Sequence, residues 1–151
     1  MKQTLLMMFI LCCTACSNGK NEYIQSVSHI NSMLNEYWIE EGKISDDMAN
    51  IAQNDFSEIK SYRASNQNKI LTLEKKASVI ISEIDKLQSA KYKSDNIDKL
   101  FQETRHNIME SLYNMKYEIN SSLYVDRAYT VTTNNLKYIQ QYNIEFRNLL
   151  N

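Results

Sequence analysis

The chain has 151 residues and a formal net charge of −1, which suits one domain and leaves no excess of positive charge for binding nucleic acid. It contains no proline and only two glycines, Gly19 and Gly42, so it lacks the turn residues that a sheet of many short strands requires. No long run of like charge occurs, which argues against a strongly basic surface.

The N-terminus has the three parts of a secretory signal. Lys2 supplies a positive charge, residues 4–11 form a short apolar run, and two small residues come directly before Cys16. The run is too short to span a bilayer, which takes about 20 apolar residues. The segment ends in Cys13-Thr14-Ala15-Cys16. This end of the chain resembles the signal peptide and lipobox of bacterial lipoprotein precursors, with Cys13 where that family has Leu. The resemblance implies that Cys16 is lipidated and becomes the new N-terminus.

Other interpretations of this end stay open. Lipidation at Cys12 or Cys13 is disfavoured, because neither follows small residues. An ordinary secretory signal cleaved near Ala15 or Ser17 and a cytosolic protein with a buried N-terminal helix are further alternatives. In enterobacterial lipoproteins an Asp after the lipidated Cys tends to retain the protein at the inner membrane. Since Ser17 stands here, the resemblance implies a lipid-anchored envelope protein, at the outer membrane facing the periplasm if the source is Gram-negative.

We therefore expect three parts: a signal peptide over residues 1–15, a lipidated flexible tether over 16–21, and a single helical domain over 22–151. The tether is predicted from a small, polar stretch after Cys16. All three cysteines lie at or before position 16. Cleavage at Cys16 would leave no internal disulfide, catalytic cysteine or cysteine-based metal site in the domain.

Beyond residue 22, apolar residues recur at steps of three and four, which predicts amphipathic helices. Five such segments occur, over residues 23–38, 48–62, 70–87, 97–119 and 136–150. Gly42 is typical of a left-handed helix stop, while Ser45 and Ser94 are typical N-caps. In the last segment the expected core stripe comprises Leu136, Ile139, Tyr142, Phe146, Leu149 and Leu150.

The segments predict an all-α fold, an up-and-down antiparallel bundle of four to five helices, with three long kinked helices as the alternative. Whether residues 45–92 form one helix or two stays open, because the apolar pattern continues almost unbroken between them. We expect a break or kink near residues 121–133, where β-branched residues gather.

Catalytic motifs are absent from the sequence: there is no HExxH, no glycine-rich phosphate loop and no nucleophile elbow. The one metal-like pattern is Glu103 with His106, which share a helix face. Because di-iron bundles need this motif twice, Glu103 and His106 are weak candidates and no metal or other cofactor is predicted. Glu40 and Glu41 are expected to be solvated charges.

Tyrosine is unusually abundant, with ten residues in the chain. Two pairs stand four residues apart, and Trp38 ends the first segment. The partner-binding hypothesis names Trp38, Tyr113, Tyr117, Tyr138 and Tyr142. The simpler interpretation is that these rings line the margin of the core with their polar atoms in water.

From these features we expect a non-enzymatic, lipid-anchored bacterial envelope protein. It would bind another protein through a helical surface, in an immunity or exclusion, assembly or structural role. Its partners would be the membrane, through the N-terminal lipid, and a protein, with no nucleic acid. The alternative is a small-ligand or metal-binding helical bundle.

Overall fold

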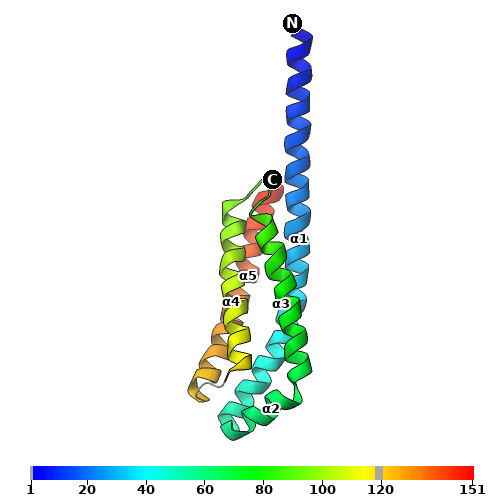
Figure 1. The fold of residues 1–151 in the computed structure, drawn as a ribbon. Coiled ribbons are helices and arrows are strands. Elements are labelled where there is room, and N and C mark those ends of the chain that lie inside the picture. The colour runs from blue at the N-terminus through cyan, green and yellow to red at the C-terminus, as the bar shows by residue number, and fades with distance from the viewer. Residues whose placement is uncertain (1, 118–120) are drawn as a thin grey trace.

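Four long helices pack side by side in this protein, and the first extends well beyond the other three (Figure 1). The computed structural model describes the backbone of residues 2–117 and 121–151, and the side chains of residues 19–117, 129 and 133–151. The elements are α1 (Lys2–Asn54), the 3₁₀-helix η1 (Phe56–Glu58), α2 (Ile59–Ser65), α3 (Gln67–Leu87), α4 (Asp95–Lys116) and α5 (Ser121–Leu150).

The long helices follow one another up and down. α1 contacts α3 and α5, and α4 contacts the same two helices, so the four form a closed square. α2 covers one end of the bundle, while the first turns of α1 project from the other end, beside which the C-terminus lies (Figure 1). The predicted all-α antiparallel bundle is confirmed.

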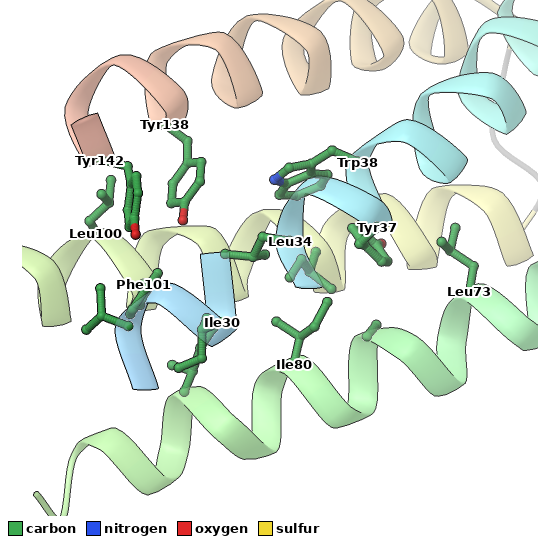
Figure 2. Packing of buried hydrophobic residues seen from close by; sticks show 14 of the residues in the cluster. Ile30, Leu34, Tyr37, Trp38, Leu73, Ile80, Leu100, Phe101, Tyr138 and Tyr142 are labelled. Carbon is green, nitrogen blue, oxygen red and sulfur yellow. The ribbon is translucent and has the colours of Figure 1, made fainter. Parts of the chain in front are cut away.

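The core is a continuous apolar cluster to which all four long helices contribute side chains. Figure 2 shows their side chains meeting between the ribbons. The predicted stripe of α3 is buried throughout: Ile70, Leu73, Ala77, Ile80, Ile84 and Leu87. Full burial of each large aliphatic side chain stabilises the fold by about 1.5–3 kcal/mol before entropy is counted.

The predicted helix stop at Gly42 is wrong. α1 continues through this residue to Asn54, and Gly42 has no positive φ. Because Ile44 and Met48 continue the buried stripe on the same face, packing holds the helix together across the glycine. Ser45 is likewise not an N-cap, since it lies inside α1 and its hydroxyl donates to Glu41.

The chain turns instead at Asp55 and Asn66. Asp55 is extended, with φ −149° and ψ 95°, and its Oδ1 accepts the Ser57 N–H at 3.0 Å, which caps η1. At Asn66 the side-chain amide donates to the Tyr62 carbonyl at 3.0 Å, where α2 gives way to α3. Residues 45–92 are therefore neither one helix nor two, because they comprise the end of α1, η1, α2 and α3.

A break or kink was expected near residues 121–133, and the structure has it directly before this stretch. α4 ends at Lys116, and α5 is helical from Ser121, so the change of direction comes before the β-branched stretch. Each such residue costs a helix only about 0.7 kcal/mol or less, whereas the same helix buries Tyr138 and Tyr142 farther along.

The predicted flexible tether is helical, because α1 includes residues 16–21. From Gly19 the helix already lies beside the α3–α4 loop, since a Cβ at Gly19 would stand 3.9 Å from the Tyr92 Cβ. Ser94 does precede α4 as expected, but its side chain makes no capping hydrogen bond.

Half of the stripe predicted for α5 points outward. Tyr142 and Leu149 are buried and Phe146 is partly buried, yet Leu136, Ile139 and Leu150 are exposed. Tyr138, which the predicted stripe did not include, is buried on the inward face of α5. α5 therefore carries apolar residues on two faces, and the bundle covers only one of them.

Candidate functional site

An exposed apolar strip lies at the C-terminal end of α4, formed by Met109 and Tyr113 of the helix and by Tyr117, its C-cap residue in extended conformation. Their exposed fractions are 55%, 56% and 52%. The two tyrosine rings lie 4.6 Å apart between centroids. We call these three residues the α4 strip. Aromatic side chains that are ordered and exposed together can cover a partner surface with little loss of rotamer entropy.

The end of the α4 strip is held by a contact from α2. The Arg63 guanidinium donates to the backbone carbonyl of Tyr117, and to that of Asn114 at 3.5 Å. The last carbonyls of a helix have no partner within the helix, and a cation suits this end of its dipole. Arg63 thus ties the C-terminus of α4 to the end of the bundle.

Three of the five aromatic candidates belong to the core. Trp38, Tyr138 and Tyr142 are buried, so their assignment to a contact surface is corrected. Tyr138 and Tyr142 point from α5 into the bundle (Figure 2), and Tyr142 stacks on Phe146 with centroids 5.3 Å apart. The Tyr138 hydroxyl donates to Asn31 on α1 at 3.2 Å, and burial raises the pKa of Tyr142 to about 12.

Glu103 and His106 line one groove between α4 and α5, with a volume of about 460 Å³. Asn107, Asn134 and Lys137 line the same groove, so its polar groups are mostly amides and one ammonium. Within the described part of the chain, no three His, Cys, Asp or Glu side chains are grouped so that they could hold a metal ion.

A buried polar cluster in the core was not expected from the sequence. Glu41 is fully buried, and its Oε1 accepts hydrogen bonds from Ser45 at 2.7 Å and from Ser111 of α4 at 2.6 Å. Its Oε2 is buried without a partner among the described residues. Burial raises the pKa of the Glu41 carboxyl, opposed by the two hydroxyl donors.

The sequence does hold a signal for this cluster. Leu34, Tyr37, Glu41, Ile44 and Met48 follow one another at steps of three and four, so Glu41 occupies a core position of the α1 stripe. Its neighbour Glu40 is half-buried and forms an ion pair with Lys76 on α3 at 2.5 Å.

The side chain of Cys16 lies outside the described residues, as do those of the rest of residues 1–18. Among the helices described, none combines the length and apolar character that crossing a bilayer demands.

Comparison with protein-family models, with curated proteins and with solved structures finds no match for this chain. Its function must therefore be argued from its own residues and geometry.

Proposed function

We propose that this chain is a non-enzymatic, lipid-anchored protein of the bacterial envelope whose helical bundle binds another protein. The α4 strip is the observation on which the binding role rests. Three large side chains, each more than half exposed, lie at the C-terminal end of α4: Met109 and Tyr113 on the helix and Tyr117 at its C-cap, while other residues of α4 are buried in the core. Contiguous exposed apolar groups of this kind mark contact sites more often than isolated ones do.

The anchor is supported by the N-terminal motif that ends in Cys13-Thr14-Ala15-Cys16. Cys16 precedes Gly19, and the described apolar core starts at Tyr23. Cleavage before Cys16 would thus remove none of the described core residues. In a Gram-negative host we place the protein at the outer membrane, facing the periplasm, in an immunity or exclusion, assembly or structural role.

A non-enzymatic role is supported by the position of the reactive groups. In the described core the Glu41 carboxyl lies beside the Ser111 and Ser45 hydroxyls, as an acid would lie beside a nucleophile, and Glu41 and Ser111 are buried. A substrate could not reach them without separating α1 from α4.

The binding role is tested by site-specific photocrosslinking in intact cells at native expression. A benzophenone side chain at Tyr113 or Tyr117 should give one discrete crosslinked product in the envelope fraction. The matched control is Ser78, which is exposed on α3. The same products from Ser78, or none from the strip, would contradict the proposal.

A second surface offers a competing location within the same test. Leu136 and Ile139 are exposed on α5, with exposed fractions of 59% and 42%. The double variant Leu136→Ala/Ile139→Ala should leave crosslinking from Tyr113 intact. Loss of the crosslinked product in this variant would indicate that the partner binds at α5.

The groove beside Glu103 and His106 supports the alternative, a bundle that binds a small ligand or a metal. This alternative predicts that elemental analysis finds metal in the purified protein and that His106→Ala removes it. Metal-free protein with unchanged behaviour in His106→Ala would eliminate the metal form of the alternative.

A further inference from the structure

The loop between α3 and α4, residues 88–94, lies at the end of the bundle from which α1 projects (Figure 1). Tyr92 in this loop lies next to Gly19, with 3.9 Å between its Cβ and a Cβ built on the glycine. Cys16 comes three residues earlier in the same helix, which corresponds to about 4.5 Å along the axis. An acyl group on Cys16 would therefore hold this loop close to the bilayer surface.

The loop is fixed to the bundle by aromatic and polar contacts. The rings of Tyr92 and Tyr23 meet edge to face, with centroids 5.6 Å apart. The Tyr23 hydroxyl donates to Asp98 Oδ1 at 2.6 Å and lies 3.4 Å from the carbonyl oxygen of Ser94. Since Tyr23 and Asp98 are on α1 and α4, the loop is held between these two helices.

Two lysines, Lys91 and Lys93, flank Tyr92 in the sequence of the loop. Both are exposed, and in the described structure no carboxylate oxygen lies within 4.0 Å of either ammonium group. The Asp98 carboxylate already accepts the hydrogen bond from Tyr23. The two charges are thus available to a ligand outside the protein.

The adjoining groove does not suit an anion as well as the loop does. It has a volume of about 340 Å³, and Glu22 and Glu83 line it together with Lys86 and Lys91. Lys86 is already paired with Glu83 at 2.6 Å. The two carboxylates disfavour an anion inside the groove, so we assign anion binding to the exposed ammonium groups of Lys91, at its edge, and of Lys93.

We propose that the loop of residues 88–94 binds the headgroups of anionic phospholipids through Lys91 and Lys93, as a second membrane contact beside the acyl chain. Phosphate-rich bilayer surfaces attract basic side chains held within a Debye length, and salt weakens the attraction. Because acyl chains and basic groups add their contributions, the contact would also orient the bundle on the membrane. The inference rests on the proposed lipid anchor.

The test uses the mature, membrane-extracted protein reconstituted into vesicles of phosphatidylcholine, with or without phosphatidylglycerol. The rate at which each lysine is acetylated by an added reagent is measured by mass spectrometry of the digested peptides. Lys91 and Lys93 should react severalfold more slowly in the anionic vesicles, and high salt should remove the difference. Lys60 and Lys69, exposed near the α2 end, serve as matched controls and should react equally in both vesicles. Equal rates for Lys91 and Lys93 in the two vesicles would overturn the inference.

A single-cysteine label provides a second readout. The only other cysteine of a processed chain, Cys16, would be acylated, so Ser89→Cys in the loop can be labelled selectively with an environment-sensitive dye. Its emission should shift to shorter wavelength in anionic vesicles. The shift should disappear in Lys91→Gln/Lys93→Gln and persist in Lys60→Gln/Lys69→Gln. A shift that survives the first pair of substitutions would overturn the inference.

The intact mass of the same sample separates the two proposals. A chain without an acyl group on Cys16 refutes the lipid anchor and this inference with it. An acylated chain that shows no lipid-dependent protection refutes the loop contact alone.

Discussion

Glu41 occupies a core position of α1 at which an apolar residue would ordinarily stand. Its carboxyl links α1 to α4 across the bundle through the Ser111 hydroxyl, and one oxygen is left without a described partner. An ionised carboxylate in such a place is costly, so the neutral form is favoured and the pKa is raised.

The raised pKa makes stability depend on pH. The folded protein holds the Glu41 proton more tightly than the unfolded chain does, so this stabilisation is complete below the ordinary carboxyl pKa of 4.5 and declines as pH rises above it. The decline is up to about 1.4 kcal/mol per pH unit until the folded-state pKa is passed.

Glu41→Gln should remove this component. We expect the free energy of unfolding of the variant to improve relative to wild type as pH increases from 5 to 8, because glutamine stays neutral. Urea unfolding followed by circular dichroism at several pH values measures the difference. A difference that is constant with pH would show that Glu41 does not titrate across this range.

The aromatic residues divide into two energetic classes. Tyr142→Ala should cost about 3–5 kcal/mol of unfolding free energy, because it empties a core site that stacks on Phe146. Tyr113→Ala should stay within about 0.5 kcal/mol, since its ring is mostly in solvent. Denaturant unfolding distinguishes the two, and a large loss in Tyr113→Ala would contradict its assignment to the surface strip.

At the scale of elements, periodicity predicted the helices well and their ends poorly. The buried positions of α3 agree with the sequence pattern because its apolar stripe is continuous, whereas its exposed apolar residues, Leu71 and Val79, are isolated from each other. α5 offers two apolar faces, and periodicity alone could not decide which one the bundle would cover. That ambiguity also concealed the inward role of Tyr138.

Gly42 illustrates why the helix ends were missed. Local propensity favours a stop there, but the buried residues on either side stabilise a continuous helix by more than the glycine costs. Gly42→Ala should therefore raise the unfolding free energy by about 0.5–1 kcal/mol, since a Cβ would meet nothing within 4 Å. Thermal unfolding measures the gain, and a loss of stability would instead indicate a left-handed turn at this residue.

At the scale of the whole molecule, the four-helix arrangement follows from amphipathic helices joined by short connections, which is why it could be predicted. The candidate surface could not be predicted as fully. Tyr113 and Tyr117 were named, but their separation from Trp38, Tyr138 and Tyr142 depends on which faces the bundle buries. The placement of Lys91 and Lys93 beside α1 likewise depends on the tertiary fold.

The proposed cleavage before Cys16 requires the bundle to be stable without the first 15 residues. A variant lacking residues 2–15 should then keep its helical circular dichroism and unfold cooperatively, with Tyr23 still packed against Tyr92. Loss of cooperative unfolding would show that the projecting part of α1 contributes to the bundle and would argue against its removal in the cell.

The central claim is that Cys16 becomes a lipidated N-terminus, and intact mass spectrometry of the protein purified from its own envelope tests it most directly. The account predicts a chain that begins at Cys16 and carries the added mass of acyl groups. A chain that begins at Met1, or one cleaved near Ser17 without acyl groups, would contradict it.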